Sequence, residues 1–402
     1  MKTIAWPMES DDVMGVLRAI QFEYFKWDIF HKGDTSILPD ALVLTGDEHR
    51  RLVDAARQVW KGLRDVEDAV CDDPALLEAM AVPKRLHPAI VDQHPDNPRV
   101  TRCDFHLTDD GDWVISEFND DVPSGFGESH GLSAVLEQHF SQRFAGLEFP
   151  GDLKAAIQNS FSPWSTIGLI HATGHSEDLQ HAALVEDWLE QAGHDTVLGS
   201  PANLSMDDGQ AHLFDTPIDA IFRYYPGEWL GELPNADDWL EASTTVPSMN
   251  PLSALAAQSK RFYAAWNEHD IDLSDEVRDV LDRYLPRSVY LSSLDRDEIL
   301  NNPRRWVLKG AFGRMGDTVR IGPLMPKDKW KKAVDDAFDV ADLVVAQRRF
   351  DMAPLWTTRG MGYATVGVYL VDGQFAGYFS RIDKGPLIDY DSFHVPTLVE
   401  VS

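Results

Sequence analysis

The chain has 402 residues, 44% of them apolar and 10% aromatic, which is more than one hydrophobic core usually accommodates, so two or three packed lobes are expected. It carries 36 Lys and Arg against 66 Asp and Glu, a net charge of -30. A field of that sign repels phosphate backbones and anionic lipid, so neither nucleic acid nor a membrane is expected as a partner. A cationic substrate would be attracted, although an acidic surface also serves solubility alone.

The cysteine content and the apolar runs bear on the compartment. Cys71 and Cys103 are the only cysteines, too few for a disulfide framework or a zinc site. In the N-terminal stretch MKTIAWPMESDDVMG, charged residues interrupt the sequence before an apolar run reaches the length of a signal peptide, so no signal peptide is expected. No segment approaches the ~20 apolar residues that span a bilayer, and the expectation is a soluble cytoplasmic protein.

Residues 11–70 are predicted to be helical. VMGVLRAIQFEYFKW and DEHRRLVDAARQVWKGLRDVEDAV place apolar side chains three and four apart, the spacing of one helix face. The aromatic run FEYFKW, residues 22–27, would suit a stacking platform, but at this spacing its rings are expected in the core instead.

A β-hairpin with a polar face is predicted next. RVTRCDFHL and WVISEF alternate apolar with polar residues and flank TDDG, an Asp-Gly turn signal. A four-residue loop, 108–111, would set Arg102 across from Glu117, and the polar side chains would then share one side, whereas an odd-numbered loop would split them. These side chains are Arg102, Asp104, Glu117 and Asn119. Such oxygen donors suit a Mg²⁺ ion shared with substrate phosphates; the alternative is a solvated hairpin in which Arg102 merely pairs with Glu117.

From residue 164 the pattern changes to strand, helix, strand. STIGLIHAT, SEDLQHAALVEDWLEQAGH and DTVLGS, with IDAIFRYY as a further strand, predict a parallel unit with a right-handed crossover. His171, His175 and His181 lie here and raise the alternative of a metalloenzyme. The first two lie at the strand-helix junction, without helical i, i+4 placement and with no carboxylate motif nearby, which favours a loop that holds no metal.

The last third predicts a mostly antiparallel sheet, from RRWVLKG, TVRIG, LVVAQRRF, ATVGVYLV and QFAGYFSRI. Within it, WVLKGAFGRMGDTVRIG places Lys309 on a strand before a glycine-rich turn and matches neither a Walker loop nor a G-x-G-x-x-G turn that opens a helix. A glycine-rich hairpin can fold over a triphosphate because its amides approach the oxygens closely; a flexible hairpin with a surface lysine is the alternative. Gln347 lies at the end of a predicted buried strand, where neighbouring backbone groups could hydrogen-bond to the edge of a purine base. The alternative is a core strand that ends there without binding a base.

Together these motifs resemble those of the glutathionylspermidine synthetase family over most of the chain. RCD at 102–104 with EFNDD at 117–121 resembles the family's Arg-x-Asp and Glu-Tyr-Asn-Ala-Asp, and FRYYPGEWL at 222–230 resembles its Leu-Tyr-Pro-Trp-Glu-Trp run. KGAFGRMG at 309–316 resembles Lys-Pro-x-x-Gly-Arg-x-Gly, and VGVYLVDGQFAGYFSRID at 366–383 resembles the final sheet. The chain departs from the pattern at Val122, where the family has a small polar residue, and at Gly310, where it has Pro. The family's amidase module has no counterpart, so hydrolysis of a product amide is not predicted.

The resemblance implies an ATP-grasp fold in circularly permuted order, because the acidic residues precede the lysine strand. It implies three Mg²⁺ ligands, which are Asp104, Glu117 and Asn119. It implies that ATP phosphates are held by Lys309, Gly313, Arg314 and Gly316. Arg102 and Arg381 would face the transferred phosphoryl group, and Ser124 matches a position that holds the acyl substrate.

The expected fold is therefore α+β. A helical segment with the acidic hairpin occupies 1–160, a Rossmann-like pre-ATP-grasp part 161–245, and the ATP-grasp lobes 246–402. The expected activity is ATP-dependent ligation of a small-molecule or peptide carboxylate to an amine, with a polyamine as one candidate. The alternative is a catalytically inactive scaffold that binds nucleotide or metal, and the joint presence of Lys309, the acidic triad and Arg381 argues against it.

Overall fold

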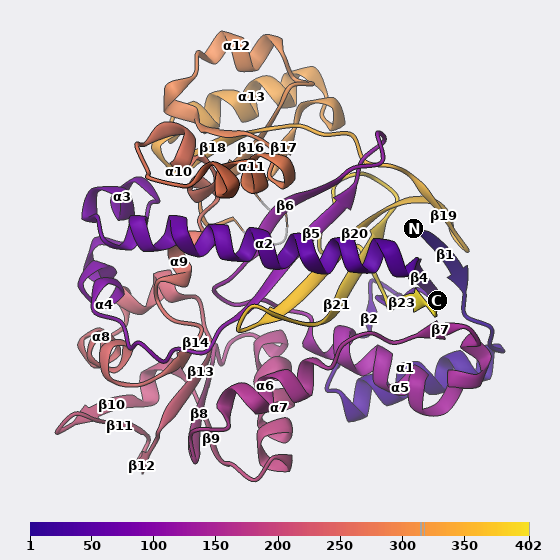
Figure 1. Ribbon diagram of the computed structural model, residues 1–402, viewed down its shortest axis with the longest axis horizontal. Helices are drawn as coiled ribbons and strands as arrows, with labels where there is room; N and C mark the ends of the chain where they lie inside the picture. Colours follow the sequence, from indigo (N-terminus) through magenta and orange to yellow (C-terminus); the bar gives the residue numbers. More distant parts are fainter. Residues whose placement is uncertain (314–315, 317, 402) are drawn as a thin grey trace.

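The computed structural model describes residues 1–313, 316 and 318–401. Strands from the two ends of the chain lie together in its centre, flanked by one lobe that holds β16 to β18 and another that holds β8, β9 and β13 (Figure 1). Arg314, predicted above as part of the phosphate loop, lies outside the described residues. Within them, no helix is both long and apolar enough to cross a membrane.

The central sheet joins the predicted hairpin to strands from the C-terminal end. It is antiparallel throughout, in the order β22-β21-β20-β5-β6, with β19 paired to β20. Its strands are β5 (Val100–Leu107), β6 (Trp113–Asn119), β19 (Leu355–Thr357), β20 (Gly360–Val371), β21 (Gln374–Asp383) and β22 (Phe393–Val395). Because β20 pairs along β5 from Phe105 opposite Val366 to Val100 opposite Val371, the hairpin completes a sheet that the other end of the chain supplies.

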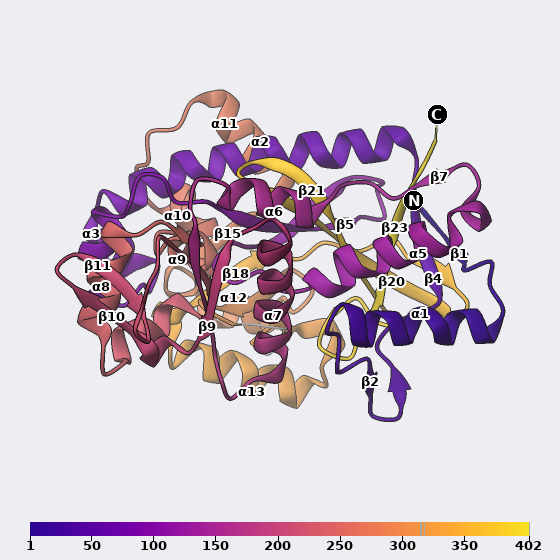
Figure 2. The same cartoon turned by 90° about the horizontal axis from the view of Figure 1, so that it is seen from below.

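One face of this sheet is dry and packs against the long helix α2 (Gly46–Cys71). Side chains on it that are 0% exposed include Cys103, Phe105, Phe118, Val366 and Val368. They share a hydrophobic cluster with Val59, Leu63 and Val66 of α2, whose spacing of three and four residues makes one apolar stripe. Figures 1 and 2 show α2 running along this side of the sheet. Burial of the stripe, rather than helix propensity, holds the helix in place.

The opposite face carries the predicted site residues in cross-strand rows. In antiparallel sheets, paired residues present their side chains to the same face. One row runs Asn119, Arg102, Tyr369 and Gly377; the next runs Glu117, Asp104, Gly367 and Phe379; a third runs Thr365, Arg381 and His394. The sheet therefore separates a hydrophobic face from one that is rich in charge.

The hairpin register differs from the prediction. Leu107 pairs with Trp113, so residues 108–112, an odd number, connect the strands. A β-bulge compensates, because the register shifts between Asp104 and Phe105 and leaves Ser116 without a cross-strand partner. Arg102 consequently lies opposite Asn119, not Glu117. The shared polar face was predicted correctly but from the wrong register. The odd loop alone would have put Asp104 and Glu117 on opposite faces, and the extra residue at the bulge returns them to the same face.

The predicted parallel unit is confirmed. Its four strands are all parallel, in the order β14-β13-β8-β9. They are β8 (Thr166–His171), β9 (Asp195–Gly199), β13 (Ala220–Tyr224) and β14 (Ser248–Met249), and α7 (Ser176–Gln191) connects β8 to β9. A small antiparallel sheet is attached, made of β10 (Leu204–Asp207), β11 (Gln210–Leu213) and β12 (Thr216–Pro217).

The predicted lysine strand lies in a separate antiparallel sheet, in the order β15-β18-β16-β17. Its strands are β15 (Ser288–Tyr290), β16 (Trp306–Gly310), β17 (Arg320–Ile321) and β18 (Val344–Arg348). The chain ends meet in a further sheet of β1 (Lys2–Ala5), β4 (Asp40–Leu44), β7 (Leu147–Glu148) and β23 (Thr397–Glu400), and β2 (Phe30–His31) pairs with β3 (Asp34–Thr35).

The predicted helices over residues 11–70 need correction. α1 spans Ser10–Glu23 and α2 spans Gly46–Cys71, but β2, β3 and β4 lie between them. The aromatic run also differs from the prediction, because Phe22 is 72% and Trp27 42% exposed. The helix ends at Glu23 and Phe25 has a φ of 56°. The prediction that residues 22–27 lie in the core assumed helical spacing, and that spacing ends within this aromatic run.

The remaining helices pack around these sheets. They are α3 (Pro74–Ala79), α4 (His87–Val91), α5 (Leu132–Phe140), α6 (Leu153–Phe161), α8 (Ala236–Thr245), α9 (Ala254–Gln258), α10 (Ala265–Glu268), α11 (Asp275–Tyr284), α12 (Arg296–Asn301) and α13 (Lys327–Phe338).

Gly367→Ala tests the packing of the polar face. A Cβ at Gly367 would lie 2.6 Å from the Phe379 carbonyl oxygen and 2.9 Å from Arg102 Cδ, so we expect a loss of about 1–3 kcal/mol in the free energy of unfolding measured with urea. Gly15→Ala is the control: nothing lies within 4 Å of its Cβ position in α1, and a gain of about 0.5–1 kcal/mol is expected. Equal stability of the Gly367 variant and the wild type would contradict the close approach.

Candidate active site between the central sheet and the lysine strand

Two cavities adjoin on the polar face of the central sheet. The smaller, of about 110 Å³, reaches from the sheet to β16, and the larger, of about 310 Å³, reaches toward the start of α7 and the segment before β22. Of the residues that the structure describes, four line both cavities, which are Glu117, Gly316, Arg381 and Ile388. A group held at this boundary would therefore touch the contents of either cavity.

The predicted lysine lies against the predicted metal strand. Lys309 is 7% exposed, lines the smaller cavity, and its Nζ donates a hydrogen bond of 2.9 Å to the Ser116 carbonyl. Ser116 is the bulge residue, and its hydroxyl lies 2.8 Å from His106 Nε2. Burial, opposed by Glu117 and assisted by Lys260, lowers the pKa of Lys309 to about 8. The sequence separates Lys309 widely from Glu117, but the fold brings both to one cavity.

The far end of the smaller cavity is largely apolar. Val307, Ile321, Phe350, Met352 and Gln347 are among its lining residues. The Gln347 side chain is 3% exposed and donates to Ser288 Oγ at 3.3 Å. The two backbone N–H groups that follow Gln347 already donate to backbone carbonyls, so these two donors are not free to read a purine edge.

The predicted metal donors share one place on the sheet. Arg102 binds Asp104 through Nε at 2.8 Å and Nη2 at 3.1 Å, and Asn119 Nδ2 donates to Asp104 Oδ2 at 3.2 Å. The Glu117 side chain is 27% exposed. Burial acts to raise the pKa of Glu117, but Lys260 and then Lys309 outweigh it and hold that pKa at about 2. Glu117 is thus ionised, with Lys260 as a close cationic partner.

These donors fit a hard divalent ion that is shared with a ligand. The carboxylates of Asp104 and Glu117 and the amide oxygen of Asn119 are all oxygen donors in adjacent cross-strand positions. Among the residues that the structure describes, no three His, Cys, Asp or Glu side chains form a cluster that could hold a metal alone. Oxygens from a bound phosphate would have to complete the coordination.

Lys260 is a site residue that the sequence reasoning missed. It starts a 3-10 helix, Lys260–Ala264, its side chain is 4% exposed, and its Nζ lies 3.1 Å from Glu117 Oε2. Its backbone N–H donates to the Ala311 carbonyl at 2.8 Å, just past β16. The available signal was a lysine in the mostly apolar stretch LSALAAQSKRFYAAW, because a buried lysine requires a partner.

Two glycines shape the turn after β16. A Cβ at Gly313 would fall 1.7 Å from Thr318 Oγ1, and Gly316 has a φ of 75°, which favours glycine. A Cβ at Gly316 would come within 3.6 Å of Asp389 Cβ. The predicted phosphate loop therefore approaches the segment before β22, and both contribute to the cavity boundary.

Ser124 lies in the larger cavity beside Arg102. The Ser124 carbonyl accepts hydrogen bonds from Arg102 Nη1 and from the Tyr369 hydroxyl. Arg102 is 4% exposed and stacks over the Phe379 ring at 4.5 Å. The guanidinium is thus fixed on the sheet by the carboxylate of Asp104, a carbonyl and a ring.

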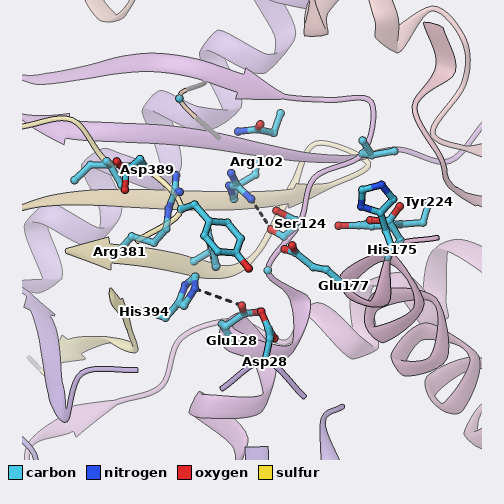
Figure 3. Close-up of a pocket in the computed structure, with 18 of the residues that line it drawn as sticks. Asp28, Arg102, Ser124, Glu128, His175, Glu177, Tyr224, Arg381, Asp389 and His394 are labelled. Atoms are coloured by element: carbon cyan, nitrogen blue, oxygen red, sulfur yellow. Dashed lines mark hydrogen bonds and ion pairs between the residues drawn. The ribbon is translucent and has the colours of Figure 1, made fainter. Parts of the chain in front are cut away.

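The larger cavity is predominantly acidic. Six carboxylates line it against three Lys or Arg among the described residues. The carboxylates are those of Asp28, Glu117, Glu128, Glu177, Asp178 and Asp389, and the cations are Lys26, Arg102 and Arg381. Figure 3 shows Arg102 and Arg381 projecting from the sheet, with Asp28, Glu128 and Glu177 on the walls around them. A ligand with an anionic end and a cationic end would match this arrangement.

A buried ion pair forms part of the acidic wall. Lys26 Nζ lies 2.8 Å from Glu128 Oε1 and 2.9 Å from Asp28 Oδ1. Although burial opposes it, Lys26 holds the pKa of Glu128 well below its usual range. His394 Nε2 lies 3.6 Å from Glu128, and burial lowers the pKa of His394 to about 4, so the ring is neutral at pH 7.

The three histidines at positions 171, 175 and 181 lie in different surroundings. His181 Nε2 accepts a 2.7 Å hydrogen bond from the Gly125 N–H, and its ring stacks on Tyr224 with centroids 4.6 Å apart. His175 lines the larger cavity, and His171 is buried at the end of β8. His181 therefore supports the loop that carries Ser124.

The two aspartates that follow Asn119 point away from the cavities. Asp120 is 0% exposed and lies 2.6 Å from both Arg64 Nη2 and Arg99 Nη2. Asp121 Oδ1 lies 2.6 Å from Arg223 Nη2. Asp120 thereby anchors the metal strand to α2, and Asp121 anchors it to the parallel sheet.

Comparison with known families agrees with this arrangement. The glutathionylspermidine synthase preATP-grasp family matches residues 16–400. The chain belongs to this family. Membership makes it a relative of synthetase-type ligases and confirms the family predicted from the sequence motifs.

Comparison with individual proteins adds little. No curated protein matches the chain. Among solved structures, it is similar to a "Putative gamma-glutamylcysteine synthetase" from Methylobacillus flagellatus, with 12% identity, a TM-score of 0.47, and coverage of 86% of this chain and 87% of that one.

Asp120→Ala tests the anchor beneath the site. Removing this carboxylate leaves Arg64 and Arg99, two largely buried cations, with Glu67 as the one carboxylate that they still share among the described residues. We expect a loss of about 3–5 kcal/mol in the free energy of unfolding. The control is Glu78→Ala, which breaks a surface pair with Lys84 whose side chains are 60% and 73% exposed, where a change within about 1 kcal/mol is expected. Similar losses in both variants would show that Asp120 is no special anchor.

Proposed function

We propose that the protein is an ATP-dependent ligase that joins a carboxylate to an amine through an acyl phosphate. The observation that carries the proposal is the boundary between the cavities, where Glu117 and Arg381 border both the space next to Lys309 and the acidic space beyond. A phosphoryl group transferred from one cavity to the other would pass this boundary. The family supports a ligase of this general kind.

The smaller cavity is the proposed nucleotide site. Its apolar end, near Gln347, would hold the base, while Lys309 and the loop with Gly313 and Gly316 would hold the phosphates, with Arg314 as a further candidate from the family motif. Lys260 is a second candidate for a phosphate contact, because its ammonium lies against Glu117. We further propose the circularly permuted ATP-grasp order, with the ligand strands β5 and β6 before the lysine strand and the predicted divisions 1–160, 161–245 and 246–402.

The chemistry needs positioning more than covalent help from the protein. A carboxylate oxygen attacks the γ-phosphorus, the bond to the ADP oxygen breaks, and ADP leaves with the bonding electrons. The amine nitrogen then attacks the acyl carbon, phosphate leaves with the electrons of the C–O bond, and the nitrogen loses a proton to solvent or phosphate. Arg102 and Arg381 would neutralise charge on the transferred group, and Ser124 would orient the acid.

Asp104, Glu117 and Asn119 would hold Mg²⁺ at the boundary. When bound, the ion would neutralise phosphate charge and align the γ-phosphoryl group with the acid. Arg102, which pairs with Asp104, would orient that carboxylate toward the phosphates.

The acidic walls favour a cationic amine. Glu177 and Asp178 in the first turn of α7 line the larger cavity together with Asp28 and Asp389. A multivalent amine would gain from several carboxylates at once, whereas an uncharged one would gain from none. A polyamine is therefore the proposed class of acceptor.

A catalytically inactive scaffold that binds nucleotide or metal is the other candidate. It would need the smaller cavity but not the buried arginine pair next to a second cavity. Arg102 and Arg381 are 4% and 8% exposed, and burial of two guanidinium groups without a function would be costly. The joined cavities therefore favour the ligase.

A coupled assay of ADP release, with acids crossed against amines and the product mass measured, tests the proposal. We expect release that requires both an acid and an amine, and a rate with a polyamine that falls as salt rises, because salt screens the acidic walls. Absence of ADP release with every pair, together with tight nucleotide binding, would favour the scaffold.

Substitution of the proposed site residues should abolish turnover while leaving the fold intact. Lys309→Ala, Glu117→Ala and Arg381→Ala each remove a contact to a charged transition state, and a loss of about 3 kcal/mol, or ~10²-fold or more in kcat/KM, is expected for each. The control is His212→Ala, a residue of β11 that lines neither cavity. Normal ADP release by Glu117→Ala would overturn the metal assignment.

The affinity for ADP should depend on pH through Lys309. Because the pKa of Lys309 is lowered to about 8, the free protein carries the ammonium below that pH and loses it above, so Kd should stay level from pH 7 to 8 and weaken up to about tenfold per unit above 8. Calorimetric titration without metal would measure this. Lys309→Arg stays charged over that range and should remove the dependence; an identical profile in the variant would show that Lys309 does not cause it.

A further inference from the structure

Cations outnumber carboxylates at the proposed metal site. Lys260 lies 3.1 Å from Glu117, Arg102 lies 2.8 Å and Arg381 3.7 Å from Asp104, and Lys309 lies against the adjacent Ser116 carbonyl. Among the described residues, four positive groups thus surround two negative ones. Without a substrate, such a place favours an anion over a bare metal ion.

Lys260 forms an ion pair with Glu117, the proposed metal ligand that lines both cavities. Besides Glu117 Oε2, its Nζ has one further hydrogen-bond partner among the described residues, the Gln258 carbonyl at 3.5 Å. Its side chain is 4% exposed, so water screens its charge poorly. A divalent ion bound to Glu117 would therefore meet an ammonium group at close range and be repelled by it.

We infer that Lys260 acts as a stand-in cation on Glu117, which excludes a bare divalent metal ion until nucleotide phosphates draw the ammonium away. This inference rests on the proposed function, since it takes Glu117 as a metal ligand. The phosphates would supply the negative charge that both Lys260 and the metal need, so each would strengthen binding of the other. Metal and nucleotide would then enter as one unit, and Lys260 would control metal binding through Glu117.

Lys309 provides a matched control for this role. It is also a buried lysine that contacts the strand of Glu117, but among the described residues its Nζ binds a carbonyl and no carboxylate within hydrogen-bonding distance. Substituting either lysine by methionine changes the net charge of the site equally. Only Lys260→Met frees the Glu117 oxygen on which the metal would bind.

The test is titration of the full-length chain with Mn²⁺ in the absence of nucleotide, with free Mn²⁺ measured by electron paramagnetic resonance. We expect Lys260→Met to bind Mn²⁺ at least ~10-fold more tightly than the wild type, corresponding to the loss of one close like-charge contact. Lys309→Met should change the affinity by only a few-fold. No gain in Lys260→Met, or an equal gain in both variants, would overturn the inference.

Thermal unfolding of each variant verifies that it folds. If Lys260→Met does not fold, Lys260→Gln takes its place, because its amide can still donate to Glu117 without a charge, and the same gain is expected. Titration of the wild type with ADP and Mn²⁺ together separates the two proposals. Failure to bind ADP would refute the proposed function. The comparison of Mn²⁺ affinities between wild type and variants without nucleotide tests only the role of Lys260.

Discussion

The cross-strand register of the central sheet is the constraint on which the site depends. Antiparallel pairing puts Glu117 beside Asp104 and Arg102 beside Asn119, and the pairing of β20 with β5 extends the same face to Arg381 on β21. A slip of one residue in any pair would turn these charges into the hydrophobic core against α2. The cost of burying them there holds the register, so the dry face and the charged face enforce each other.

The bulge at Ser116 links this register to the lysine strand. By leaving the ladder, Ser116 restores the common face of Asp104 and Glu117 and also presents its carbonyl to Lys309. Its hydroxyl contacts His106, which lies 3.4 Å from Thr365 on β20. An irregularity of one residue thus aligns the acidic strand and joins two sheets that have no strand in common.

The polar run EFNDD divides its side chains between two tasks. Glu117 and Asn119 lie on the face of the cavities. Asp120 and Asp121 are buried in ion pairs with arginines of α2, of the segment just before β5, and of β13. Backbone N–H groups of both aspartates donate to Gln258 Oε1, two residues before Lys260. The site is therefore tied to three parts of the molecule at the point where the chemistry is proposed, which limits how far its donors can move.

The sequence alone determined the family, the parallel unit and the lysine hairpin, because these depend on local periodicity and on motif order. It did not determine the hairpin register, the strands between α1 and α2, or the exposure of Phe22, since a bulge and a helix end leave the apolar pattern nearly unchanged. Only the tertiary structure brought Lys260 to Glu117 and joined the two cavities. Contacts between residues far apart in the chain depend on how sheets pack, and no local pattern encodes that packing.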